Sequence, residues 1–108
     1  MLSTAELGKL RTRVSKLNNK FIRLFDALAD INRFKIFTLL LESKENNICV
    51  SEFADILGIS VPAASQQLKN LETSGLIKRV RDGQMICYQV SYEDPTVKSI
   101  VKTVKESL

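Results

Sequence analysis

The sequence of 108 residues contains no histidine and only two cysteines. Histidine is the usual base beside a catalytic Ser or Cys and the commonest metal ligand, so its absence removes the usual form of both sites. The chain also lacks a glycine-rich phosphate loop and a nucleophile placed beside a base at a familiar spacing. We therefore expect a protein that is not an enzyme and that binds no cofactor.

Long apolar runs are also missing, because no stretch approaches the roughly 20 residues that cross a bilayer. The first twenty residues are interrupted by the basic side chains of Lys9, Arg11, Arg13 and Lys16. They therefore lack the apolar segment of a secretory signal. The two cysteines, Cys49 and Cys87, are too few for the disulfide framework of a small secreted domain. We predict a cytoplasmic protein with no membrane partner, in which both cysteines are free thiols.

The composition is that of a globular domain, with 44% hydrophobic and 26% charged residues. The length suits one domain, to which we assign residues 1–108. The net charge is +4, and the basic excess lies in residues 1–20 and 61–92. This excess alone is weak support for an anionic partner.

Helical periodicity dominates the first part of the chain. Apolar residues recur in steps of three and four at Leu7, Leu10, Val14, Leu17, Phe21, Leu24 and Leu28. This spacing predicts a helical stripe, which the poor helix propensity of Asn18 and Asn19 divides into helices over about 3–17 and 19–29. Asp30 suits the N-cap of a third helix, from 31 to about 43, which is apolar nearly all round and therefore buried. The polar run 43–47 predicts a loop.

The second part of the chain has a different order of elements. A short helix over 51–57 ends at Gly58, and Ser60 caps a helix that runs to residue 74. Strand-like runs at 76–81 and 85–90 flank Asp82-Gly83, a strong hairpin signal, and a last helix begins at Pro95. This order predicts a mainly α fold with a β-hairpin wing, the winged helix-turn-helix, with the helix-turn-helix at 51–74 and the wing at 76–91.

The second helix of this pair is predicted to present a polar stripe outward. Its inward residues are Ala64, Leu68 and Leu71. We expect them to pack against Phe53 and Leu57 of the first helix and Ile59 of the turn. Outward, Gln66 can pair with adenine, Ala63 can contact a thymine methyl group and Lys69 can reach phosphate. Pro62 and Ser65 share this stripe. Such a stripe can also be no more than the solvated face of the helix.

The hairpin favours DNA binding over that simpler interpretation. Lys78, Arg79 and Arg81 lie on its first strand and Gln84 follows its turn, so a basic wing would flank the helix beside the DNA backbone or minor groove. Basic hairpins also occur as solubilising edges. Helix stripe and wing together make double-stranded DNA the better prediction.

These segments resemble the ArsR/SmtB family of small dimeric regulators over residues 25–90. Residues 25–33 (FDALADINR) are similar to the family pattern F-K-A-L-A-D-P-T-R before the core helix. Residues 57–71 (LGISVPAASQQLKNL) are similar to L-G-L-S-Q-P-A-V-S-H-H-L-K-x-L. From Gly75 to Tyr88 the chain follows the wing pattern G-L-V-x-x-R-R-x-G-R-x-x-x-Y.

The resemblance implies base and phosphate contacts by Val61, Pro62, Ser65 and Gln66, and a wing contact between residues 81 and 84. Val61 and Gln66 replace the Gln and His of many relatives, so the operator sequence does not transfer. Together with the stripe, this gives the predicted DNA-binding set Ser60, Val61, Pro62, Ala63, Ser65, Gln66, Lys69, Arg79, Arg81 and Gln84.

Family members form dimers through their first and last helices, here residues 1–17 and 94–108. Both helices carry an apolar stripe that a core of this size is not expected to cover, and a self-complementary patch favours a two-fold homodimer. Its paired helices would contact a pseudo-palindromic DNA site.

Many relatives sense metals through a Cys-x-Cys pair before the turn or an Asp/His set on the last helix. This chain has Cys49-Val50-Ser51 at the first place, and Glu93, Asp94 and Glu106 near the second. Soft metals require several thiolate or imidazole ligands, so no metal is expected. Cys49 lies near a helix N-terminus, which lowers a thiol pKa and leaves a thiol switch open. The alternative is that Cys49 and Cys87 are small buried apolar residues.

The sequence thus predicts a sequence-specific DNA-binding transcriptional regulator, a repressor by the resemblance, that acts as a homodimer. Two alternatives stay open. One is a winged-helix module that binds another protein, because a fold does not fix a function. The other is a redox-responsive repressor that uses Cys49.

Overall fold

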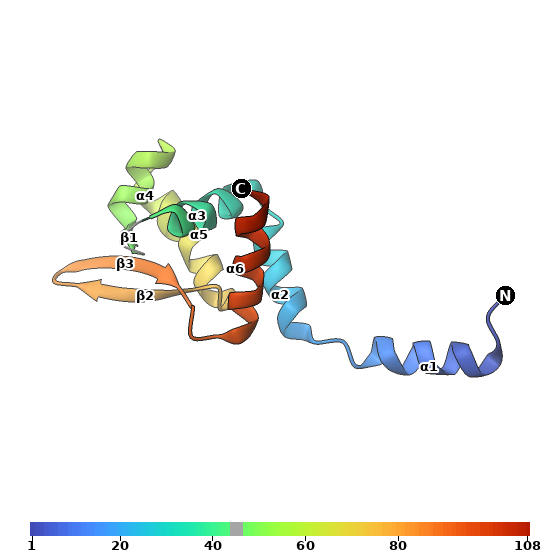
Figure 1. The fold of residues 1–108 in the computed structure, drawn as a ribbon. Coiled ribbons are helices and arrows are strands. Elements are labelled where there is room, and N and C mark those ends of the chain that lie inside the picture. The colour runs from blue at the N-terminus through green and yellow to red at the C-terminus, as the bar shows by residue number, and fades with distance from the viewer. Residues whose placement is uncertain (44–46) are drawn as a thin grey trace.

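The computed structural model describes residues 1–43 and 47–108, which contain six helices and three strands. Helix α1 (Thr4–Ser15) projects away from a body formed by the other elements (Figure 1). That body comprises α2 (Asn19–Leu28), α3 (Ile31–Glu42), β1 (Ile48–Cys49), α4 (Val50–Leu57), α5 (Val61–Ser74), β2 (Ile77–Asp82), β3 (Met85–Val90) and α6 (Pro95–Ser107). Of the loop predicted at 43–47, positions 44–46 lie outside the described residues.

Side-chain caps determine where the helices begin. The Asn18 side chain accepts a hydrogen bond from the N–H of Lys20 at 2.8 Å, which confirms the predicted break between the first two helices. Asp30 accepts from the N–H groups of Asn32 and Arg33, both at 3.0 Å, and starts α3. Each cap satisfies amide groups that have no partner within their helix, so short polar residues set these boundaries.

Helix α3 lies at the centre of the body, as its apolar circumference predicts. Its side chains Ile36, Phe37, Leu40 and Leu41 are buried. They belong to one continuous core with residues from α2, α4, α5, α6 and the sheet. This core fixes the helix-turn-helix and the wing on one scaffold.

The wing hairpin, β2 and β3, belongs to a three-stranded antiparallel sheet in the order β1-β3-β2. Asp82 pairs with Met85 across the turn, and Gly83 there has a φ of 61°, a left-handed conformation that favours glycine. The hairpin is therefore confirmed. Strand β1 was not predicted, because two residues are too short to show a periodicity.

The last helix differs from expectation in one respect. We expected that the subunit could not fully cover its apolar stripe; Val97, Ile100, Val101 and Val104 are nevertheless buried, and Leu108 at the end of the helix is 55% exposed. Helix α6 lies against the body beside α3, so its stripe completes the subunit's own core (Figure 1). Within the described ranges, by contrast, none of α1's side chains is buried, and Val14 is 64% exposed.

The prediction of two free thiols is also wrong, because Cys49 and Cys87 form a disulfide. The unpredicted strand β1 is the reason, since it places Cys49 directly opposite Cys87 in the β1–β3 ladder. Both cysteines are buried, as expected of small apolar residues. Neither position is therefore a simple surface thiol.

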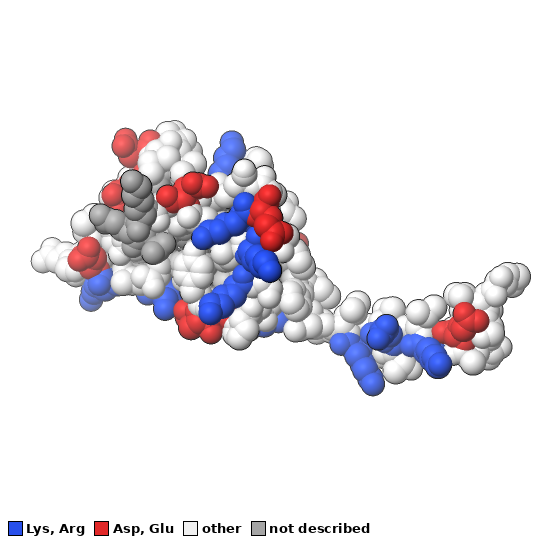
Figure 2. All heavy atoms as spheres, in the orientation of Figure 1, with Lys and Arg blue, Asp and Glu red and all other residues white. Residues whose placement is uncertain are grey.

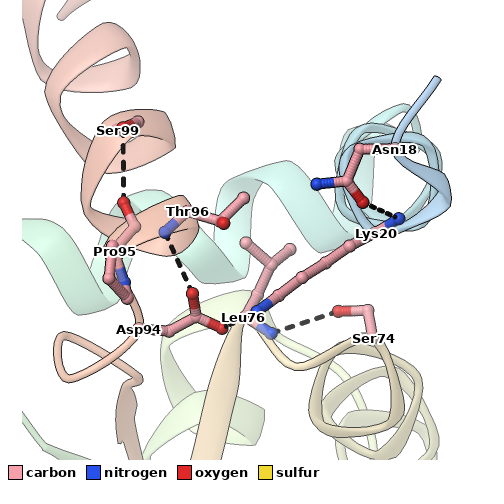
Figure 3. Close-up of polar contacts among 8 residues, drawn as sticks. All are labelled: Asn18, Lys20, Ser74, Leu76, Asp94, Pro95, Thr96 and Ser99. Atoms are coloured by element: carbon pink, nitrogen blue, oxygen red, sulfur yellow. Dashed lines mark hydrogen bonds and ion pairs between the residues drawn. The ribbon is translucent and has the colours of Figure 1, made fainter. Parts of the chain in front are cut away.

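An ion pair joins the starts of α2 and α6. Lys20 reaches the carboxylate of Asp94, which also accepts a hydrogen bond from the N–H of Thr96 and so caps α6 (Figure 3). The hydrogen bond from Lys20 is the largest cause that lowers the pKa of Asp94 below its ordinary value of 3.8. Ionised Asp94 therefore stabilises the folded chain.

We expect Asp94→Asn to lower the Tm at neutral pH and to lose this effect in acid. Because the folded-state pKa is lowered, the stabilisation is complete above the unfolded pKa and is lost as the pH falls through the folded value. The difference in Tm from the unmodified chain, followed by circular dichroism, should shrink below about pH 4. Glu106→Gln, at an exposed carboxylate of the same helix, is the control. A difference that does not change with pH would contradict the prediction.

Candidate DNA-binding surface

The turn between α4 and α5 determines how α5 is presented. Gly58 ends α4 with a φ of 65°, and the N–H of Ile59 donates to the carbonyl oxygen of Ala54 at 3.0 Å. Glycine adopts this left-handed conformation without the cost that a Cβ brings. Ser60 then caps α5 by accepting from the N–H of Ala63 at 3.2 Å. Three residues thus connect the two helices, as predicted.

The inward face of α5 anchors this helix in the core. Ala64, Leu68 and Leu71 are all 0% exposed, as the spacing predicts. Leu57 is only partly buried, and Ile59, which was expected to pack inward, is 39% exposed. Ile59 lies in the turn, where its amide bonds back to α4 while its side chain stays at the surface.

The opposite face of α5 is open to solvent over its first three turns. Its exposed members are Ser60, Val61, Pro62, Ala63, Gln66 and Lys69, and Ser65 is partly buried. No acidic residue occurs between positions 61 and 71. The N-terminal end of a helix also carries partial positive charge. This face therefore has groups suited to base edges and phosphates.

The wing is less basic than its sequence suggests. Lys78 forms an ion pair with Glu93 at 3.1 Å, and Arg79 forms one with Glu72 at 3.3 Å. Arg79 also lies over the ring of Tyr88, 6.0 Å from its centroid. Its contact with Tyr88, and then the charge of Glu72, raises the pKa of the Arg79 guanidinium. Arg79 stays charged, but its nearest anion belongs to the protein.

Arg81 and Gln84 are the wing candidates nearest the tip. Both are exposed, and Arg81 makes no ion pair with any residue that the structure describes. Gln84 borders a groove of about 370 Å³ between α5 and the wing, which we call the α5–wing groove. Its lining is Cys49, Val50, Ser51, Val61, Ser65, Gln84, Met85 and Ile86. Helix and wing residues predicted separately thus meet in one concavity.

Three lysines on α6 form a basic stripe that was not predicted from the sequence. Lys98, Lys102 and Lys105 recur at helical spacing on the exposed side of α6 (Figure 2). Their spacing of four and three residues predicts one helical face. The net charge of residues 93–108 gives no sign of this basic face, because the segment has equal numbers of acidic and basic residues. Met85 and Ile86, also missed, bring exposed apolar surface to the α5–wing groove.

Within 1–43 and 47–108, no three His, Cys, Asp or Glu side chains come together as metal ligands. In the same ranges, none of the helices is long and apolar enough to cross a membrane.

The chain is similar to known transcriptional regulators in sequence. Residues 30–79 match a family model described as "Bacterial regulatory protein, arsR family". A cadmium resistance transcriptional regulatory protein, CadC homolog, of Staphylococcus aureus is 35% identical over 80 residues, or 74% of this chain and 63% of that protein. The HTH-type transcriptional repressor SmtB of Mycobacterium tuberculosis is 32% identical over 53 residues, or 49% and 39%. The chain therefore spans less than two thirds of these relatives.

The fold is likewise shared with solved structures. A homodimeric winged helix-turn-helix DNA-binding domain from Mycobacterium bovis superimposes with a TM-score of 0.70 at 24% identity, covering 99% of this chain and 87% of that one. At this identity the likeness shows the winged helix-turn-helix fold, which confirms the predicted fold class.

Proposed function

Because residues 30–79 match the model of the arsR family of bacterial regulatory proteins, we propose that the protein is a sequence-specific, double-stranded DNA-binding repressor. The observation that carries the proposal is the open α5 face beside the α5–wing groove, with acceptors, donors and two cations, Lys69 and Arg81, that form no ion pair with any described residue. In this docking, α5 enters the major groove while Arg81 and Gln84 follow the adjacent backbone or minor groove. A protein held on a promoter in this way blocks access to it.

The individual roles follow from side-chain chemistry. Gln66 would pair with a base edge, Ser65 would bond to a base or phosphate, and Val61 and Ala63 would contact thymine methyl groups. Ser60 and Lys69 would donate hydrogen bonds to the phosphate backbone, and Pro62, which has no N–H, would make only van der Waals contact with the DNA. Arg79 would contribute less to DNA affinity than Arg81, because a phosphate would have to compete with Glu72 for the Arg79 guanidinium.

We propose a homodimer as the DNA-binding form, with α1 of one copy seated on the other. Leu10, Val14 and their apolar neighbours on α1 are exposed in the single chain. An apolar groove of about 400 Å³ between α2 and α6, the α2–α6 groove, is available to receive them. Its lining is Phe21, Phe25, Leu28, Ala29, Phe34, Ser99, Ile100, Thr103, Val104 and Ser107. Apolar surfaces of this kind are typical of association sites.

The partners we propose are DNA and a second copy, in the cytoplasm, with no metal and no membrane. The sequence has two cysteines and no histidine, which is too few thiolate and imidazole ligands for a soft metal even when the disulfide is reduced. No catalytic role is proposed, because the α5–wing groove contains no acid–base pair beside a nucleophile.

A DNA titration at two salt concentrations tests the proposal. Phosphate neutralisation makes the affinity fall steeply between about 50 and 200 mM salt, whereas docking of another protein at this face need not respond in that way. Absence of any binding to a random pool of duplexes at low salt would reject the DNA-binding function. It would favour a module that binds another protein.

We expect Gln66→Ala and Arg81→Ala to have different effects on DNA binding. Gln66→Ala should relax base preference at one position of a selected duplex, by about 1–3 kcal/mol of discrimination. Arg81→Ala should instead weaken binding to all duplexes about equally and reduce the salt dependence. Fluorescence anisotropy with matched and mismatched duplexes measures both. If neither change alters binding, the proposed docking is wrong.

A further inference from the structure

The Cys49–Cys87 disulfide lies where the helix-turn-helix meets the wing. Cys49 is the residue immediately before α4, and its N–H donates to the Glu52 carboxylate at 2.9 Å at the start of that helix. Cys87 lies in β3, paired with Cys49 on one side and with Val80 of β2 on the other. The bond closes a segment with a sequence separation of 38 that contains α4, the turn, α5 and β2.

The same bond lies in the wall of the proposed DNA-binding surface. Cys49 lines the α5–wing groove together with Val61 and Ser65 of α5 and with Gln84 of the wing. Cys49 is 8% exposed and Cys87 is fully buried. Of the two cysteines, Cys49 is therefore the one that borders the groove, and DNA that occupies the groove would cover it.

We propose that the Cys49–Cys87 pair is a thiol–disulfide site that controls DNA binding by clamping the wing to the helix-turn-helix; the proposal rests on the DNA-binding function above. Strand β1 has only two residues, so the disulfide supplements a very short ladder. Breaking the bond leaves Gln84 and Arg81 less firmly placed relative to α5. DNA must then order the wing as it binds, which lowers the affinity.

The chemistry requires a small thiol in one direction and a peroxide in the other. A thiolate attacks Cys49 Sγ, the bond between the two Sγ atoms breaks, and Cys87 leaves as a thiolate that takes up a proton. A second small thiolate then attacks the small-molecule sulfur of this mixed disulfide, and Cys49 leaves as a thiolate that takes up a proton, which gives two protein thiols and one small-molecule disulfide. In reverse, hydrogen peroxide takes two electrons and two protons from the thiols, forming the disulfide and two waters.

DNA binding and disulfide formation affect each other reciprocally. If the disulfide raises DNA affinity, bound DNA must stabilise the disulfide by the same factor. DNA in the groove also covers Cys49 sterically. Reduction should therefore be slower, and less complete at equilibrium, when duplex DNA is bound.

The test compares oxidised and dithiothreitol-reduced protein on one duplex, selected from a random pool with the oxidised form. We expect the Kd to rise at least about fivefold on reduction, the lower end of typical coupling, and to return after peroxide treatment. The double variant Cys49→Ser with Cys87→Ser should bind DNA with the Kd of the reduced protein, and neither dithiothreitol nor peroxide should change that Kd. Circular dichroism of each form verifies that it remains folded, and Cys49→Ala with Cys87→Ala is the second variant should the serine form fail to fold.

The remaining outcomes are separable. An equal or lower Kd after reduction would overturn the clamp while leaving DNA binding intact. Air-oxidised protein that contains two free thiols by mass spectrometry, even after peroxide treatment, would overturn the disulfide site itself. If neither form binds any duplex, the proposed function fails, and a disulfide that still forms and reduces reversibly would show that this failure is independent of the thiol chemistry.

Discussion

The double change Leu10→Glu with Val14→Glu is expected to convert the protein into a monomer and to weaken binding to a pseudo-palindromic duplex by about 100-fold or more. Leu10 and Val14 lie on the exposed apolar stripe of α1. Charges placed there would have to be buried in the apolar α2–α6 groove of the partner, which is costly without a counter-charge. Sedimentation measures the dimer, and anisotropy measures the affinity.

The matched control is Ala5→Glu with Thr12→Glu, which adds the same charge on the opposite side of α1. Ala5 and Thr12 are also exposed, so the helix can tolerate the change, and the dimer should persist. Affinity for a duplex containing one half-site should be similar in both double variants. A dimer that survives the Leu10 and Val14 changes would show that α1 does not form the interface.

Leu68→Ala is expected to lower the free energy of unfolding by about 2–5 kcal/mol, the range for removing a buried leucine side chain. Leu68 is fully buried and belongs to the core that α5 shares with α3 and α6. Such a loss is a large part of the total stability of a small domain. Urea unfolding with the disulfide intact measures it.

Lys69→Ala is the natural comparison for that experiment. Lys69 follows Leu68 directly but is exposed, so its removal should leave the stability nearly unchanged. Its proposed phosphate contact predicts weaker binding to every duplex. If Lys69→Ala destabilised the fold as much as Leu68→Ala, the assignment of inward and outward faces on α5 would be wrong.

Much of the fold could be predicted because its signals are local. Asn18, Asp30 and Ser60 each cap a helix within a few residues of their own position, and Gly58 and Gly83 mark turns that need a left-handed backbone. The spacing of Ala64, Leu68 and Leu71 likewise determines which side of α5 is buried. These features depend on neighbours in the chain, so a sequence contains them almost entirely.

The errors concern contacts between distant segments. Strand β1 exists because β3 pairs with it, and that pairing places Cys49 opposite Cys87. The burial of the α6 stripe depends on α3 lying beside it, as Figure 1 shows. The ion pairs of Lys78 with Glu93 and of Arg79 with Glu72 reduced the basic wing to one unpaired arginine among the described residues. Local periodicity carries no information about any of these partners.

The sequence by itself determined the order of helices and hairpin, the polar face of α5 and the resemblance that names a family, because these follow from spacing, caps and turn residues. Only the tertiary structure decided that the two sulfurs are bonded, that α6 serves its own core while α1 stays uncovered, and that helix and wing border a common groove. These properties depend on tertiary contacts that form when the core packs, and such contacts join residues that are distant from one another in the chain.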